Sequence, residues 1–167
     1  MRRGERAGTR GESSATLLRV APHDGETDPF DLQRFVAAQD SGGTYERAAA
    51  ELRAGRKASH WMWFVFPQIA GLGQSEMSRT YAIGSLAEAL AYLAHPVLGP
   101  RLKECCRLVL ETQATTAAEI FGAIDAIKLR SCVTLFGRAD ASEVVFRQVL
   151  ERYFNGRPDR ATMSLLG

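Results

Sequence analysis

Apolar residues recur at helical spacing along most of the chain after residue 28. The most regular stripe comprises Leu102, Cys105, Cys106, Val109 and Leu110. A second comprises Leu129, Cys132, Val133 and Phe136, which fall at i, i+3, i+4 and i+7. A stripe of this period predicts an amphipathic helix with one buried face. Both stripes therefore predict helices that pack against a shared core.

Capping signals divide the chain into short helices. Ser85-Leu-Ala-Glu88 and Thr116-Ala-Ala-Glu119 have the spacing of capping boxes, and the second should open a short helix that ends at Gly122. His95-Pro96 should end the preceding helix, with His95 satisfying its last carbonyls. Further helix starts are predicted from polar residues ahead of apolar runs, at Asp28-Pro29, Thr44, Asp125 and Ser142.

No alternating β-branched runs are joined by a tight turn, so hairpins are not expected. The pattern predicts an all-α fold, a single compact domain of about six to eight short helices over residues 28–167. Residues 1–27 contain five arginines and four acidic residues but only a short apolar patch. Such a segment buries too little apolar surface to offset its ordering entropy, so we expect a disordered tail there.

The composition of the chain argues against several classes of function. The 167 residues carry a net charge of +2, with no dense basic run, so nucleic acid is not expected as a partner. The longest apolar run, residues 61–66, is far shorter than a membrane span, so no membrane association is expected. The odd number of cysteines, three, is typical of a reducing compartment, which predicts a cytoplasmic protein. Neither the cysteines nor the scattered histidines have metal-ligand spacing, and no cofactor is predicted.

The segment Ser59-His-Trp-Met-Trp-Phe-Val-Phe-Pro-Gln68 holds both tryptophans of the chain. Its period does not distinguish helix from strand, because it is apolar on every side. One interpretation is a central core element, since aromatic side chains bury large areas. The other is that Trp61 or Trp63 lines a ligand pocket with His60 and Gln68 at its rim, because these side chains combine flat or apolar bodies with directional hydrogen-bonding groups. Both can hold together.

A second polar group lies on the helix that follows Asp125. Lys128 and Arg130 fall in its first turn, where cations oppose the helix dipole unless an anion faces them, and Ser131 is adjacent. A solvated face or a salt bridge would explain them. The alternative is an anion site shared with Ser78 and Arg79, which follow the turn at Gly71-Leu-Gly73.

The aromatic segment, the Gly71-Leu-Gly73 turn, Ala91-Tyr-Leu-Ala-His-Pro96 and Lys128-Leu-Arg-Ser-Cys-Val-Thr-Leu-Phe136 together resemble a bacterial family known as domain of unknown function 1810. The resemblance covers residues 28–166 and implies a small helical domain, usually standing alone, with no assigned reaction. Some members carry the label calpastatin, but such protease inhibitors are disordered and repetitive. The family usually has Ser where this chain has Cys132, which argues against Cys132 as a required nucleophile.

These observations lead to one functional hypothesis and one alternative. The hypothesis is a cleft between the aromatic segment and the Lys128–Thr134 helix that recognises a small anionic metabolite, a nucleotide or sugar phosphate. Trp61 and Trp63 would stack, His60 and Gln68 would hydrogen-bond, and Arg79, Lys128 and Arg130 would balance charge, with Ser78 and Ser131 beside them. No reaction type follows; in an enzyme, His60 would be the candidate acid or base. The alternative is a protein–protein module or homodimer that uses the tryptophan-rich surface.

Overall fold

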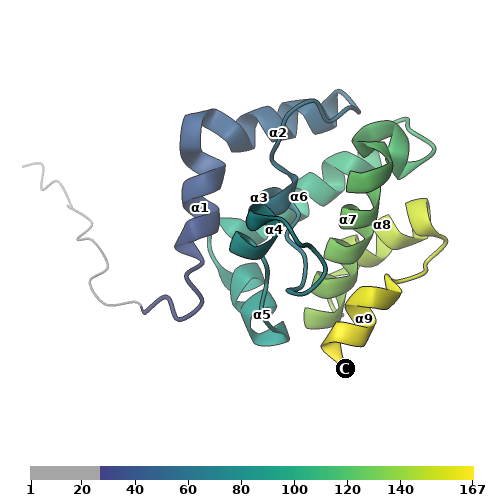
Figure 1. Ribbon diagram of the computed structural model, residues 1–167. Coiled ribbons are helices and arrows are strands. Elements are labelled where there is room, and N and C mark those ends of the chain that lie inside the picture. The colour runs from purple at the N-terminus through teal and green to yellow at the C-terminus, as the bar shows by residue number, and fades with distance from the viewer. Residues whose placement is uncertain (1–26) are drawn as a thin grey trace, which may run out of the picture.

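The computed structural model describes residues 27–167, so the predicted tail lies outside the described residues except for Thr27. The described chain forms the helices α1 (Gln33–Asp40), α2 (Thr44–Arg53), α3 (Met62–Val65), α4 (Glu76–Thr80), α5 (Leu86–Ala94), α6 (Leu98–Glu111), α7 (Ala117–Ala139), α8 (Val144–Phe154) and α9 (Arg160–Leu166), with a 3₁₀ turn, Ser41–Gly43, between α1 and α2 (Figure 1). The all-helical, compact domain predicted from the sequence is confirmed. None of the helices within residues 27–167 has the length and apolarity that crossing a bilayer requires.

The long helix α7 organises the packing. It contacts α5, α8 and α9, while α6 packs against α2, α5 and α8. The short helices α3 and α4 lie between α1 and α7 in the view of Figure 1. The aromatic segment forms a four-residue helix, α3, which ends at Phe66 with non-helical backbone (φ −124°, ψ 70°). Shortly after it, Ile69 forms a parallel bridge with Ile83.

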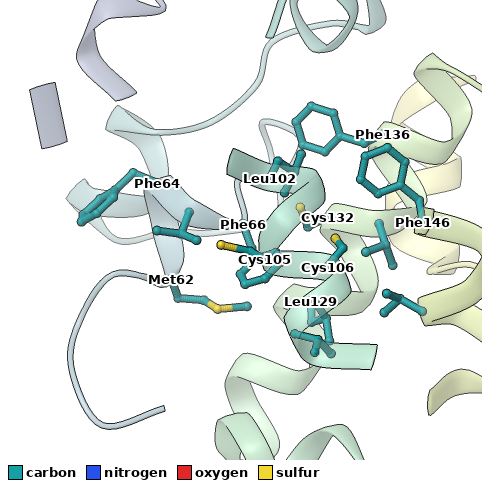
Figure 2. Close-up of a cluster of buried hydrophobic side chains, with 14 of the residues drawn as sticks. Met62, Phe64, Phe66, Leu102, Cys105, Cys106, Leu129, Cys132, Phe136 and Phe146 are labelled. Carbon is teal, nitrogen blue, oxygen red and sulfur yellow. The ribbon is translucent and has the colours of Figure 1, made fainter. Parts of the chain in front are cut away.

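Both predicted stripes face one core, in which Leu110 alone of their residues is partly exposed. Figure 2 shows Leu102, Cys105 and Cys106 of α6 together with residues of α7, α8 and the aromatic segment. All of the labelled side chains, Met62, Phe64, Phe66, Leu102, Cys105, Cys106, Leu129, Cys132, Phe136 and Phe146, are buried. The three cysteines are free thiols inside this core. Their place in the stripes explains them as packing residues.

Both predicted capping boxes form their cap: Ser85 Oγ accepts a hydrogen bond from the Glu88 amide, and Thr116 Oγ1 accepts one from the Glu119 amide. The return bond is shifted by one residue, because the carboxylates of Glu88 and Glu119 accept from the amides of Gly84 and Thr115 and not from those of the cap residues. The helix opened by Thr116 is interrupted at Gly122, whose backbone (φ 77°, ψ 166°) is not helical, and the chain resumes as a helix directly afterwards. The predicted end at Gly122 is therefore a break within α7.

Three predicted helix starts are displaced. Asp28 accepts hydrogen bonds from the amides of Leu32 and Gln33, but Asp31 adopts a left-handed φ of 51°, so a turn precedes α1. Thr44 is the first residue of α2 rather than its cap, because Gly43 is left-handed before it. Ser142 donates its hydroxyl to Asp140, and α8 begins two residues later.

One predicted cap is wrong for a different reason. Asp125 lies inside α7 and caps no helix; ion pairs with Lys57 and with Lys128, three residues along α7, hold its carboxylate instead. His95 ends α5 as predicted: its backbone amide donates to the carbonyls of Ala91 and Tyr92, while its ring Nδ1 accepts from the amides of Val97 and Leu98, at the start of α6. Helix α9 was not predicted at all, although Asp159 caps it by accepting from the Thr162 amide.

Candidate functional site

A closed loop carries the first part of the candidate site. The bridge between Ile69 and Ile83 joins the two ends of residues 70–82, with the Ile83 amide donating to the Gln68 carbonyl and the Ala70 amide to the Ile83 carbonyl, both at 2.8 Å. Inside this loop Gly73 lies directly against Ser78: a Cβ on Gly73 would be 2.3 Å from Ser78 Cβ. Only glycine permits that approach, so the turn is folded tightly back on α4.

This loop forms one wall of a cavity of about 260 Å³. Helix α7 and the start of α9 form the other walls. The lining residues are Gln68, Leu72, Gly73, Ser78, Ile124, Ile127, Lys128, Ser131, Asp159 and Ala161. The structure thus brings together Gln68, Ser78, Lys128 and Ser131, which the sequence analysis had proposed from three separate segments.

Lys128 is the cation of the cavity, and it belongs to a charged network. Its Nζ lies 3.0 Å from Asp125 Oδ1, and Lys57 Nζ lies 3.0 Å from Asp125 Oδ2. Although burial raises the pKa of the Asp125 carboxyl, its hydrogen bonds and ion pairs with the two lysines lower the pKa overall. One carboxylate is therefore shared by two ammonium groups, and the trio carries one net positive charge.

Lys128 also lies over an aromatic ring. Its Nζ is 5.1 Å from the centroid of the Trp63 ring, within the range of a cation–π contact. Trp63 is half-buried and packs against the core. Trp63 therefore supports Lys128 from outside the cavity lining, whereas the sequence analysis had expected it to stack on a ligand.

The uncharged polar groups of the cavity retain hydrogen-bonding capacity. Ser131 Oγ donates to the Ile127 carbonyl at 3.3 Å, which leaves its oxygen free to accept. Among the described residues, none forms a hydrogen bond with the side-chain amide of Gln68. Ser78 Oγ is paired with Ser75 Oγ at 2.7 Å. Gln68, which is half-buried, is thus the neutral group open to a ligand, whereas Ser131 is only 2% exposed.

The lip of the cavity is apolar and exposed. Ile124 and Ile127 of α7 are 74% and 61% exposed, and both line the cavity. Large apolar side chains on a rigid helix next to a polar hollow are typical of a surface that covers part of a ligand or partner. The cavity therefore combines a polar interior with an apolar rim.

Besides Trp63, four more residues proposed from the sequence lie outside the cavity lining. Trp61 is fully buried, and its Nε1 donates to Glu51 at 2.8 Å, so it is not available to stack on a ligand. His60 and Arg79 are exposed and do not line the cavity. Arg130 donates to the carbonyls of Arg157 and Pro158, at 2.9 and 3.2 Å, and fastens the connection between α8 and α9.

The sequence analysis missed Asp159, Ala161 and the isoleucines of the lip. Asp159 had a local signal, because it precedes an apolar run and caps it through Thr162. Ile124 and Ile127 had no local signal, because in the sequence they resemble residues of an apolar helical stripe. Larger hollows occur elsewhere on the described chain, one of about 580 Å³ along Arg53, Arg56, Glu111 and Glu119. Those four side chains are exposed, so that hollow is a solvent channel between charged groups.

Comparison with known proteins places the chain in a family without assigning it a reaction. The crystal structure of the conserved hypothetical protein Rv1873 from Mycobacterium tuberculosis, at 1.38 Å, is similar to this chain with a TM-score of 0.80 and 52% sequence identity. The similarity covers 83% of this chain and 98% of that one. No curated protein matches. The model of the family described as "Protein of unknown function (DUF1810)" matches residues 29–166, and the chain belongs to this family.

Proposed function

We propose that this protein binds a small anionic metabolite in the cavity between the 70–82 loop, α7 and the start of α9. One observation supports this most directly: Gln68, Ser78, Lys128 and Ser131, which come from three separate segments, line the same open cavity. Binding pockets typically combine an apolar surface with a few polar groups that fix orientation. The apolar lip and polar interior of this cavity have that composition.

Charge and volume limit the ligand. The Lys57–Asp125–Lys128 trio contributes one net positive charge, and Asp159 adds a negative charge to the lining. A ligand with one anionic group is therefore favoured over a polyphosphate. The volume, about 260 Å³, lies just below the usual range of roughly 300–1,000 Å³ for ligand pockets. It suits a sugar phosphate or the sugar-phosphate part of a mononucleotide better than a dinucleotide.

The proposal concerns binding and assigns no reaction. His60 was the candidate acid or base, but it is exposed in the connection before α3 and does not line the cavity. The side chains that do line the cavity are suited to holding a ligand by charge and hydrogen bonds. We therefore propose recognition of the ligand as the function of this site.

The alternative, a protein–protein module or homodimer, depended on an exposed tryptophan patch. Trp61 is fully buried and Trp63 is half-buried, so the described surface offers no such patch. A partner would instead meet Ile124 and Ile127. Light scattering of Ile127→Ser tests this alternative: a loss of mass relative to the unchanged chain would favour a homodimer.

A thermal-shift titration of the full chain tests the proposed function. Inorganic phosphate, sulfate and several sugar monophosphates are the probes, and a ligand at 100 times its Kd should stabilise the fold by about 2.7 kcal/mol. Lys128→Met should abolish the shift because it removes the cation. Lys103→Met is the matched control, since Lys103 is similarly exposed (28% against 22%) and also pairs with a carboxylate, Glu143. No shift with any anion, or a shift that survives Lys128→Met, would overturn the proposal.

A further inference from the structure

Asp159 lines the cavity and carries a fixed and partly unused carboxylate. Its Oδ2 accepts from both the amide and the hydroxyl of Thr162, each at 2.8 Å. Its own amide donates to Thr134 Oγ1 at 2.8 Å, which fastens the residue to α7. Oδ1 accepts no hydrogen bond from a described residue. Because an ionised carboxylate only accepts hydrogen bonds, Oδ1 is a preorganised acceptor on the cavity wall.

The Gln68 amide is also free, and both groups are open to solvent. Among the described residues no polar side-chain atom is both sealed from solvent and without a partner. The unused Oδ1 of Asp159 and the amide of Gln68, both in the lining, are thus within reach of a molecule that enters the cavity. A ligand can gain these hydrogen bonds without breaking existing protein contacts.

An inorganic anion would bond with the cation of this lining but not with its hydrogen-bond acceptors. It would satisfy the free N–H groups of Lys128 but would also bring negative charge toward Asp159. A ligand that carries hydroxyl donors beside its anionic group satisfies both, because hydroxyls donate to Asp159 while the anion accepts from Lys128. Gln68 can donate and accept, so it suits a hydroxyl as well.

We infer that the ligand of this cavity contains a hydroxylated sugar monophosphate unit, with its phosphate at Lys128 and its hydroxyls bonded to Asp159 and Gln68. This inference rests on the proposed function and adds the chemistry that selects the ligand. The unit is either a free sugar phosphate or part of a mononucleotide. In a mononucleotide, the flat base would pack on the exposed Ile124 and Ile127 at the lip.

Calorimetric titration of the full chain tests the inference with inorganic phosphate, ribose 5-phosphate and uridine 5′-monophosphate. Ribose 5-phosphate should bind at least about tenfold more tightly than phosphate, as expected for added hydrogen bonds to a charged group. Asp159→Asn should remove most of that difference. It should leave phosphate binding unchanged or tighter, because it removes the negative charge but keeps an oxygen that can cap α9.

A matched control separates this effect from a general loss of charge. Asp140→Asn alters an exposed carboxylate that also bonds a nearby hydroxyl, that of Ser142, but does not line the cavity. It should leave both affinities unchanged. Thermal melting of Asp159→Asn without ligand checks that the fold is retained, so that a lost affinity difference can be attributed to the cavity.

The outcomes distinguish the inference from the proposed function. Equal affinity for phosphate and ribose 5-phosphate, or equal weakening of both by Asp159→Asn, overturns the inference and leaves anion binding standing. Absence of binding by any probe overturns both. If uridine 5′-monophosphate binds more tightly than ribose 5-phosphate, and Ile127→Ser removes that difference, the inference is supported with a mononucleotide as the ligand. If the two compounds bind equally tightly, the inference is supported with a free sugar phosphate as the ligand.

Discussion

The indole Nε1 of Trp61 donates a hydrogen bond of 2.8 Å to the carboxylate of Glu51, so the aromatic segment is fastened to the C-terminal half of α2. The same carboxylate accepts from the amides of Ala58 and Ser59, at 2.7 and 3.0 Å, and from the Ser59 hydroxyl. A single side chain thus satisfies four donors of the connection between α2 and α3. It also allows Trp61 to be buried without an unpaired N–H.

Glu51→Gln should destabilise the fold by about 2–3 kcal/mol, because the amide cannot replace all four charge-assisted bonds and some donors lose their partner. Urea unfolding followed by tryptophan fluorescence measures this effect. Glu46→Gln, the same substitution at an exposed position of α2, should change stability by no more than about 0.5 kcal/mol. Equal effects of the two variants would contradict the role assigned to Glu51.

Lowering the pH should destabilise the fold, because the Glu51 carboxylate becomes protonated. Burial raises the pKa of this carboxyl, but the hydrogen bonds from Ser59, Ala58 and Trp61 outweigh it and lower the pKa from 4.5 to about 2. A carboxyl with a depressed folded-state pKa contributes stability that is complete above its unfolded pKa and is lost as the pH falls through the folded value. Stability should therefore decline between about pH 4.5 and pH 2. The stability of the Glu51→Gln variant should decline less steeply over that range, as measured by urea unfolding at each pH.

Gly73→Ala should destabilise the 70–82 loop because its new Cβ would meet Ser78 Cβ at 2.3 Å and Ser78 Oγ at 2.4 Å. Overpacking of this kind costs about 1–3 kcal/mol. Ser78→Gly removes both clashing atoms, so adding it to Gly73→Ala should recover part of the loss. A double-mutant cycle by urea unfolding measures the coupling, and strictly additive effects would show that the two residues do not clash.

The three cysteines should be unreactive in the folded protein. Burial, followed by the charge of Glu104, raises the pKa of the Cys105 thiol to about 12, and burial also raises the pKa of Cys106 and Cys132. Because the thiolate is the reactive form, labelling by a thiol reagent should follow the rate of unfolding. Ser164→Cys places a thiol at an exposed position of α9 and should react at once. A native thiol that reacts as fast would refute the prediction.

Local signals predicted the helices well and the tertiary contacts less well. Ser85 and Thr116 cap as expected because their partners lie three residues away. Asp125 has an equally plausible capping position, but Lys57, far away in sequence, holds its carboxylate, and no local pattern contains that information. The aromatic segment had no decisive period, and its burial depends on Glu51, which lies in the preceding helix.

The difference between local signals and tertiary contacts also explains which of the predicted site residues line the cavity. Lys128 and Ser131 both line the cavity because they lie three residues apart on one face of α7. Arg130 occupies the same helix but bonds to the carbonyls of Arg157 and Pro158, so its role depended on where a later loop returns. Asp159 was missed because the helix that it caps was not predicted.

The pairing of Ile69 with Ile83 has a consequence for engineering. Because the two ends of residues 70–82 meet at one point, the tip of this stretch is a cassette that can be exchanged or lengthened, provided that Tyr81, which packs against Phe35 and Phe64, is kept. Since this cassette forms one wall of the cavity, libraries confined to it would alter what the cavity accepts and leave the core sequence unchanged.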